Sequence, residues 1–581
     1  MSEKRVNLKL TGPIPGPVKV IWAALEAISI VPSHHRTTST IFRIREAIMP
    51  HFCIADFQKM LFPLLLLLLT ALPAIAMSET AEQAYQEGLA MQQARRTEEA
   101  VRAYQRAIRL DPKLGPAHYE IGWSYWVLGD WRKVVQHWQT AKQLGALPQH
   151  SVKYLAEAQQ NLNGKLDPLV RAGIDEKASA EMSNGGRVAL KLIARFQHYN
   201  PRPPNAADHF DPYVFSPKSV RFLPDGSKAY VNALEGFTTI VYDPKRLARE
   251  NVIIHRFSNR RRALFSNRNE TSWLGFPADG PADPNVFNGK PVESELTHNG
   301  KYLWVPYYRR DYDVFSVMPS AVAIVDTGTD RIIRVMATGP IPKYVVASPD
   351  GKWLAVIHWG DNTVGLIDVS SGNPAEFRHA TLISVGKRID LSRIETKDRD
   401  HGCGFCLRGA VFTADGKYLL VARMGGGGIA VIDIRARQYI GTVRGMRPTP
   451  RHLELSSDGS ILYLSSSFAG YVSAYRTRDL VTAAQQHQSA LAPLRETYTG
   501  AATRTIALSP DDRLIFAAVN KESKIVVLEA SSLTPLLRLD ADSYPVGMAV
   551  SPDGKQLWVT AQGRKRRGGN SVMVFQIDVA G

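Results

Sequence analysis

Cysteine is scarce in this chain, which has only 3 cysteines among 581 residues. Two of them, Cys403 and Cys406, lie close together, and Leu407 stands where c-type haem attachment needs a histidine. The sequence also lacks a nucleophile elbow, a Walker loop and a dinucleotide fingerprint in a suitable context. These absences exclude covalently attached haem of that type and leave no catalytic motif from which to read an activity.

Long apolar runs are equally rare, and the prominent one is the leucine-rich segment 61–70 with its continuation 71–76. It ends in Ala-Ile-Ala, the small-residue pattern of a signal-peptide cleavage site, which places the mature N-terminus near Met77. As a membrane anchor the segment is short of the ~20 residues that a helix needs, and Pro63 and Pro73 interrupt it. We therefore expect an exported protein, periplasmic or secreted, with no membrane span in its mature form.

A leader of this kind normally begins a protein, yet about 60 residues precede the apolar run. We interpret residues 1–76 as an over-extended start plus the signal peptide, with translation beginning at Met49 or Met60. Removing these residues lowers the formal net charge from +17 to +13. The mature chain stays basic, which favours acidic partners or small anions. Nucleic acid is not an expected partner of an exported protein.

Residues 77–170 carry a period of 34 residues, in which small and aromatic residues recur in step. The recurring pairs are Gly88 and Gly122, Tyr104 and Trp138, and Ala107 and Ala141, and Pro112 closes the first unit. The pattern resembles the tetratricopeptide repeat, with a third helix over 151–162 capping the pair. The resemblance implies a surface that docks a partner protein, while Trp123, Tyr125, Trp126 and Trp131 equally fit simple packing. We predict a polar linker over 171–206.

From residue 207 onward the chain repeats one phrase seven times: an apolar strand, a polar turn and a second strand. The turns are centred on residues 225, 299, 350, 415, 458, 511 and 553. Their spacing suits four short strands per unit, which is typical of a β-propeller. The fold class is therefore α plus all-β, a short helical solenoid followed by a seven-bladed propeller over 207–581. Val345, Ala347, Leu354 and Val356 are expected to point into a blade.

The phrases PKYVVASPDGKWLAVIHWGDNTVGLIDVS at 342–370 and VGMAVSPDGKQLWVTAQ at 546–562 resemble the YVTN-type β-propeller repeats. The resemblance spans the whole of 207–581 and implies the propeller fold. It says less about function, because relatives range from binding proteins to lactonases and haem-d1 modules.

A cation stands seven residues before the turn in five of the seven units. The five are Lys218, Lys343, Arg408, Arg451 and Arg504. Because the turn ends the innermost strand, these residues begin it, at the mouth of the central channel. Basic and aromatic loop residues are expected on the same face, namely Tyr307 to Arg310, Tyr312, Arg423, Lys521 and Arg564 to Arg567. We predict an anion-binding site at this mouth.

Two explanations of the cations remain open at this stage. They hold an anionic ligand, or they form ion pairs between blades with Glu293, Glu295 and Glu454. The Cys403–Cys406 segment precedes Arg408 and lies on the same face. A local disulfide is favoured, a metal held by both sulfurs with His401 and Asp400 is an alternative, and a redox dithiol is a third.

These features favour an exported binding or scaffolding protein whose helices dock a partner protein and whose propeller holds an anionic small molecule or acidic polymer. No cofactor is predicted beyond the alternative metal at Cys403 and Cys406. The second hypothesis is a propeller enzyme or cofactor-binding protein of lactonase-like or haem-d1-related type. His358, His401 and His452 are candidates for it without an assigned role.

Overall fold

The computed structural model describes residues 79–162 apart from Arg95 and Gly129, and residues 177–580 apart from several short segments. Those segments are 204–205, 266–273, 275–283, Val314, 392–397 and 564–568. The predicted leader 1–76 and the basic residues Arg564 to Arg567 therefore lie outside the described residues. No helix in the described part is long and apolar enough to cross a membrane.

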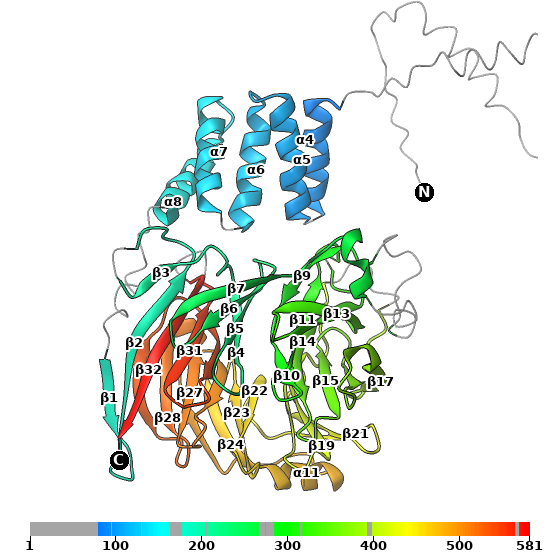
Figure 1. Ribbon diagram of the computed structural model, residues 1–581, viewed down its shortest axis with the longest axis vertical. Coiled ribbons are helices and arrows are strands. Elements are labelled where there is room, and N and C mark those ends of the chain that lie inside the picture. Colours follow the sequence, from blue (N-terminus) through cyan, green and yellow to red (C-terminus); the bar gives the residue numbers. More distant parts are fainter. Residues whose placement is uncertain are drawn as a thin grey trace, which may run out of the picture. The chain divides into compact units, whose positions relative to one another are not determined.

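Four helices and a shorter fifth occupy the N-terminal part of the described chain (Figure 1). They are α4 (Ala81–Gln93), α5 (Thr97–Leu110), α6 (Gly115–Leu128), α7 (Trp131–Gln143) and α8 (Val152–Leu162). Gly88 and Gly122 face Tyr104 and Trp138 so closely that a Cβ would lie 2.4 and 2.1 Å from the two rings. The close approach predicted at these glycines is thus present. Trp126 is buried with Trp138 in the helical core, where packing explains it.

Seven antiparallel sheets, the blades, make up the rest of the described chain, as predicted (Figure 1). Five blades are simple four-stranded sheets in chain order, each running from an inner to an outer strand. Blade 1 is β4 (Pro217–Phe222), β5 (Ala229–Ala233), β6 (Thr238–Asp243) and β7 (Ala248–Ile254). Blade 3 is β14 (Pro342–Ala347), β15 (Trp353–His358), β16 (Thr363–Asp368) and β17 (Arg378–Ser384). Blade 4 is β18 (Leu407–Phe412), β19 (Tyr418–Arg423), β20 (Ile429–Asp433) and β21 (Gln438–Val443).

Blades 5 and 6 follow the same plan. Blade 5 is β22 (Pro450–Leu455), β23 (Ile461–Ser466), β24 (Tyr471–Arg476) and β25 (Arg495–Tyr498), with α11 (Thr477–Gln485) between its last two strands. Blade 6 is β26 (Thr503–Leu508), β27 (Leu514–Val519), β28 (Lys524–Glu529) and β29 (Pro535–Asp540). Blade 2 is less regular. It contains β10 (Glu295–Thr297), β11 (Tyr302–Arg310), β12 (Ser320–Asp326) and β13 (Arg331–Thr338). Two further strands extend it, since β9 (Phe287–Pro291) pairs with β11 and β8 (Arg256–Phe257) pairs with β9.

The two ends of the propeller meet in blade 7, which corrects the linker predicted over 171–206. Its C-terminal strands are β30 (Pro545–Val550), β31 (Gln556–Ala561) and β32 (Ser571–Ala580). The N-terminal strand β2 (Arg187–Gln197) pairs beside β32 and completes the blade. The strand β1 (Lys177–Glu181) lies outside β2, and the short β3 (Asp208–Phe210) pairs parallel with β2. β2 pairs antiparallel with β32 along its whole length. The supposed linker therefore supplies the strand that closes the ring, which removes an exposed sheet edge.

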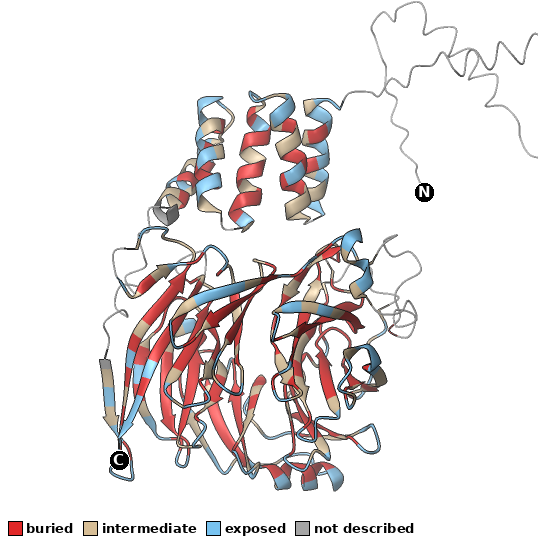
Figure 2. Cartoon of the chain, viewed as in Figure 1, coloured by how far each residue is buried: buried red, intermediate tan, exposed pale blue. Residues whose placement is uncertain are grey.

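The hydrophobic cores lie between neighbouring blades, where the inward faces of the strands are almost wholly buried (Figure 2). Val345, Leu354 and Val356 are buried against strands of blade 2, and Ala347 packs at the edge of that cluster. The predicted inward residues are thus confirmed. The turn between the first two strands carries an Asp that accepts a hydrogen bond from a Ser or Thr hydroxyl, as Asp350 does from Ser348. This turn fixes one end of each inner strand and leaves the other end for the channel.

Candidate anion site at the channel mouth

Each of the five predicted cations is the second residue of an inner strand. Lys218, Lys343, Arg408, Arg451 and Arg504 occupy that place in β4, β14, β18, β22 and β26. In every one of these strands the pairing register shifts across this residue, so it lies in a β-bulge. A bulge redirects a side chain out of the regular pleat. The same irregularity, repeated in five blades, turns five basic side chains towards the channel.

A second local feature repeats immediately before each strand. The preceding residues have positive φ, between 48° and 64°, although none of them is glycine. They are Ser216, Ile341, Cys406, Thr449, Ala502 and, in blade 7, Tyr544. Such a conformation costs roughly 1 kcal/mol for a residue with a side chain. Its recurrence indicates that the closed propeller holds this turn in place. Blade 7 has the same turn, but the second residue of its inner strand is Val546 and not a cation.

The five side chains interact electrostatically across the channel, which shows that they converge. Burial lowers the pKa of Lys218 well below its usual value, and the charges of Arg504, Arg408 and Arg451 lower it further. Burial and the charges of Arg504 and Arg408 likewise lower the pKa of Arg451. Burial, with Arg408, lowers the pKa of Arg504 to about 10. The surroundings therefore destabilise the protonated, positively charged forms of these side chains.

Two of the five cations have a carboxylate partner. The Arg408 guanidinium donates from Nη2 to Glu293 Oε1 at 2.8 Å, and its side chain is 7% exposed. Lys343 forms an ion pair with Asp400, and its ammonium lies 4.0 Å from the centre of the Trp359 ring. Burial nevertheless lowers the pKa of Lys343 to about 7. The predicted inter-blade ion pairing is thus present for Arg408 and Glu293.

The other three cations lack such partners in the described part of the chain. Lys218 and Arg504 have no ion pair there, and Arg504 lies 5.9 Å from the centre of the Tyr544 ring. Arg451, 8% exposed, donates from Nη1 to the Met424 Sδ at 3.2 Å, a weak acceptor. Lys218, Arg451 and Arg504 come from blades 1, 5 and 6. They form the half of the mouth whose positive charges a bound anion would balance.

A second layer of polar residues lies three positions further along the inner strands. The Arg221 guanidinium donates to Glu295 Oε2 at 3.0 Å and to the Ser294 carbonyl at 3.1 Å. Glu454 faces His452, whose Nδ1 is 3.8 Å from its Oε1. Glu295 and Glu454, predicted as partners of the mouth cations, thus belong to this deeper layer. The sequence analysis overlooked Arg221, although its place three residues after Lys218 matches that of Glu454 after Arg451.

The titration of this second layer differs from that of the mouth. Partial burial within the channel, where the side chain stays 35% exposed, raises the pKa of Glu454 to about 7. Arg221 opposes the rise, and Glu295 adds to it. Burial lowers the pKa of His452 to about 4, so its imidazole is neutral at pH 7. Tyr344 packs edge-on against that imidazole, with ring centres 5.8 Å apart. Glu454 is therefore a carboxyl group that gains or loses a proton near neutral pH.

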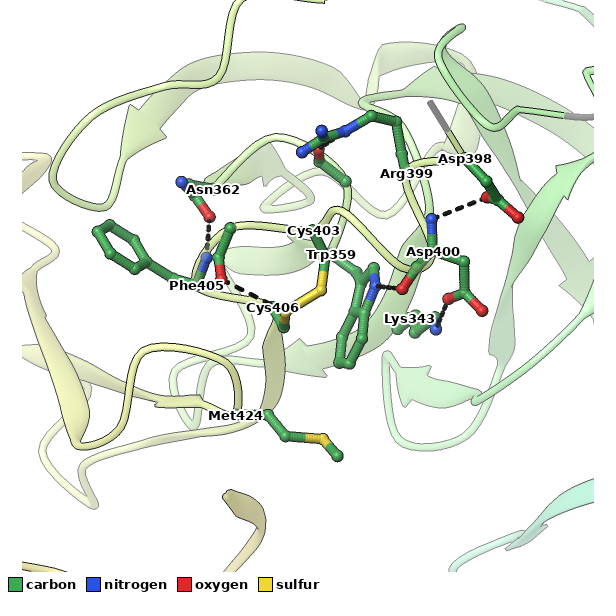
Figure 3. Close-up of a disulfide and its surroundings, with 12 residues drawn as sticks. Lys343, Trp359, Asn362, Asp398, Arg399, Asp400, Cys403, Phe405, Cys406 and Met424 are labelled. Carbon is green, nitrogen blue, oxygen red and sulfur yellow. Dashed lines mark hydrogen bonds and ion pairs between the residues drawn. A yellow bond between two sulfur atoms is a disulfide. The ribbon is translucent and has the colours of Figure 1, made fainter. Parts of the chain in front are cut away.

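The loop 398–406 lies beside the mouth and is closed by a disulfide between Cys403 and Cys406 (Figure 3). Several contacts hold the loop in place. Trp359 Nε1 donates to the Asp400 carbonyl at 3.1 Å, and the Phe405 N–H donates to Asn362 Oδ1 at 2.8 Å. The loop brings Asp400 to Lys343, as Figure 3 shows.

The metal alternative for this loop is not supported. The two sulfurs are bonded to each other, and the His401 side chain is 85% exposed and directed at Asp398, 3.4 Å away. Within the described residues there is no group of three or more His, Cys, Asp and Glu side chains that could hold a metal ion.

Other predicted candidates have structural roles. His358 is buried, its Nε2 accepts from the Gly339 N–H at 3.0 Å, and its Nδ1 lies 2.8 Å from Thr363 Oγ1. Arg423 is 3% exposed and stacks on Phe405 at 3.8 Å from the ring centre. Arg310 is 1% exposed within blade 2. Among the predicted basic loop residues that the structure describes, Lys521 alone is an exposed cation, and its ammonium lies 5.4 Å from the centre of the Phe468 ring.

Comparison with known protein families gives a match over part of the propeller and not over the whole chain. Residues 337–581, which contain blades 3 to 7, match the family model described as Lactonase, 7-bladed beta-propeller. No curated protein matches the chain.

Among solved structures, the chain is similar to a Myceliophteria thermophila Cps50 (Swd1) beta-propeller domain, with 12% identity, coverage of 62% of this chain and 96% of that one, and a TM-score of 0.45. It is also similar to Kuenenia stuttgartiensis hydrazine synthase, with 15% identity, coverage of 64% and 98%, and a TM-score of 0.43.

Proposed function

We propose that this protein binds a small anion at the mouth of the propeller channel. One observation carries the proposal: Lys218, Arg451 and Arg504 converge there without an ion pair of their own among the described residues, and the carboxylate that attracts all three, Glu293, is already paired with Arg408. Buried cations are otherwise paired, because an unpaired charge is expensive to keep away from water. An arginine side chain binds carboxylate or phosphate through two parallel hydrogen bonds, so either group fits.

The test is calorimetric titration of the purified protein with citrate and with inorganic phosphate at low salt. We expect binding that weakens at least about tenfold when Arg451 and Arg504 are both replaced by Gln, since each hydrogen bond to a charged group contributes roughly 1.5–3 kcal/mol. The matched control is the K352Q/K417Q double variant, which removes two exposed charges at the turns on the opposite ends of the strands. Equal affinity of the two double variants contradicts the proposal.

A second candidate function is hydrolysis of a lactone in the same channel. The family match over 337–581 and the carboxyl group of Glu454, with its pKa of about 7, favour it. Ionised Glu454 would accept a proton from water, whose oxygen attacks the lactone carbonyl. As the ring C–O bond breaks, the Glu454 carboxyl would return that proton to the departing alkoxide oxygen, and the new carboxyl group would release its own proton to solvent. The hydroxy acid that leaves carries a carboxylate, the group that the cations at the mouth attract.

Acid release from simple lactones, followed in a pH-stat, tests this activity directly. We expect the E454Q variant to lose it, and the E250Q variant, changed on the exposed outer strand β7, to keep it. Turnover that survives E454Q assigns the chemistry to another residue, and no turnover by the parent leaves the binding function alone.

We further propose that the chain is exported, with its leader removed before Met77, and that its helices dock a partner protein. The leucine-rich run ending in Ala-Ile-Ala and the Cys403–Cys406 disulfide, a bond typical of oxidising compartments, support export. N-terminal sequencing of protein from the periplasm tests it, and a chain that retains residues 61–76 contradicts it.

A further inference from the structure

The channel carries charge of opposite sign at two depths. Around the mouth, five cations face two carboxylates, those of Glu293 and Asp400. Three residues further along the inner strands, Arg221 faces two carboxylates, those of Glu295 and Glu454. The mouth therefore has an excess of positive charge, and the deeper layer has an excess of negative charge whenever Glu454 is ionised.

The deeper layer is formed by convergence across the channel, since its members come from different blades. Arg221 is in β4, Glu295 in β10, Tyr344 in β14, and His452 with Glu454 in β22. Arg221 interacts electrostatically with Glu295, Tyr344 and Glu454, although these belong to three other blades. The layer also keeps access to water, because the side chains of Arg221 and Glu454 are 37% and 35% exposed.

Glu454 is the member of this layer with unused hydrogen-bonding capacity. Glu295 is engaged by Arg221 at 3.0 Å, whereas the nearest charged or polar partner of Glu454 in the described chain is His452 Nδ1 at 3.8 Å. That Nδ1 is itself buried without a hydrogen bond. The Glu454 carboxyl, whose side chain is 35% exposed, would be satisfied by a ligand that presents a hydrogen-bond donor to it.

We infer that the ligand is a small bifunctional acid, with its anionic group at the mouth and a hydroxyl or amino group held by Glu454 in the deeper layer. This inference rests on the proposed anion-binding function and adds the substrate class. Three residues of strand span about 10 Å at most, and the bulge shortens the rise, so a linear chain of about six carbons fits. The open product of a lactone, a hydroxy acid, belongs to this class.

Three probes of equal chain length separate the two layers: hexanoate, its ω-amino derivative and adipate. At about pH 8, where Glu454 is ionised, we expect the ω-amino acid to bind about tenfold more tightly than hexanoate, and adipate to bind more weakly than the ω-amino acid. ω-Hydroxyhexanoate, measured in parallel, distinguishes a neutral donor from a cation.

Protonation of Glu454 is the internal control. At about pH 6 the preference for the ω-amino acid over hexanoate should fall to less than about threefold, since Glu454, with a pKa of about 7, then lacks its charge. Protonation of Lys343 strengthens the binding of both acids, so the ratio of their two affinities at one pH does not depend on it. The other groups facing Glu454 are Arg221, Glu295, His452, Tyr344 and, opposite it on β23, Tyr463. In this window Arg221, whose pKa is raised, stays charged, while His452, with its pKa lowered to about 4, and the two tyrosines, with raised pKa values, stay neutral.

Replacement of Glu454 gives the decisive result. The E454Q variant should show no pH-dependent preference for the ω-amino acid over hexanoate, while E250Q keeps the preference of the parent. If hexanoate binds and the parent shows no preference at pH 8, the assignment of the deeper layer is overturned while the proposed function stands. If citrate or phosphate binds the parent and none of the six-carbon acids does, the substrate class is overturned; if none of these anions binds, the proposed function fails instead.

Discussion

The two halves of the channel mouth differ in how their positive charges are balanced. In blades 3 and 4, Lys343 and Arg408 are paired with Asp400 and Glu293. In blades 1, 5 and 6, Lys218, Arg451 and Arg504 occupy the same strand position without an ion pair of their own in the described chain, and they share only the attraction of the Glu293 carboxylate that Arg408 binds. One local sequence feature therefore serves two purposes, structural in one half and, as we propose, ligand binding in the other.

The paired half gives the largest expected effect. Replacing Glu293 by Gln leaves the buried Arg408 unpaired and removes the charge that also attracts Lys218. We expect the free energy of unfolding to fall by about 3 kcal/mol, measured by urea denaturation, because breaking a buried pair from one side strands the remaining charge. A citrate concentration that saturates the parent should recover part of the loss. An unchanged stability would show that Arg408 does not depend on Glu293.

The disulfide loop in the paired half gives the next effect. The C403S/C406S double variant should lose about 2 kcal/mol or less and remain folded, because the disulfide closes a very short loop. Contacts such as that of Trp359 with the Asp400 carbonyl hold the loop independently. Thermal melting of the variant and of the parent in reductant measures the difference. Complete unfolding on reduction would contradict this prediction.

The unpaired half should respond with the opposite sign. Replacing Arg451 and Arg504 together by Gln relieves repulsion without stranding a carboxylate, so we expect the unliganded protein to gain about 1 kcal/mol of stability. The same double variant should lose the stabilisation that added citrate gives the parent. Thermal melts with and without citrate at low salt provide both values. Destabilisation with no citrate effect in the parent would make the whole ring structural.

The smallest effect is a pH dependence of the unliganded protein. The pKa of Lys343 is lowered to about 7 in the folded state, so between pH 7 and its unfolded value the folded protein binds fewer protons than the unfolded one. Its stability should therefore rise with pH in this window, by about 1 kcal/mol between pH 7 and 8. Denaturation at several pH values checks this, and the K343Q variant should flatten the profile. A stability that falls over the window, with K343Q unchanged, would contradict the assignment.

The sequence predicted the fold and the strand position of the cations well, because both depend on local patterns. Turn residues such as Asp350 and the alternation of Val345 with its neighbours act within a few residues. It was wrong about 171–206. Val188, Leu190 and Leu192 alternate there as in a strand, but the partner strand β32 lies hundreds of residues away, and no local pattern identifies that partner.

The sequence did not predict which charged residues of the site are paired, for a related reason. Glu293 and Arg408 are 115 residues apart, and only the curvature of the ring brings blade 2 and blade 4 side chains together. Glu295 and Glu454 were predicted, with Glu293, as inter-blade partners of the mouth cations. The structure assigns them to the deeper layer, with Arg221 and His452.

The sequence by itself determined seven repeats, the alternation that builds each blade, and a cation at one position in five inner strands. These features follow from strand periodicity and turn chemistry, which are local. Only the tertiary structure decided which cations are paired, that a bulge turns each towards the channel, and that a second layer lies behind them. The physical reason is that electrostatic partners are set by distance across the channel, and ring closure fixes that distance.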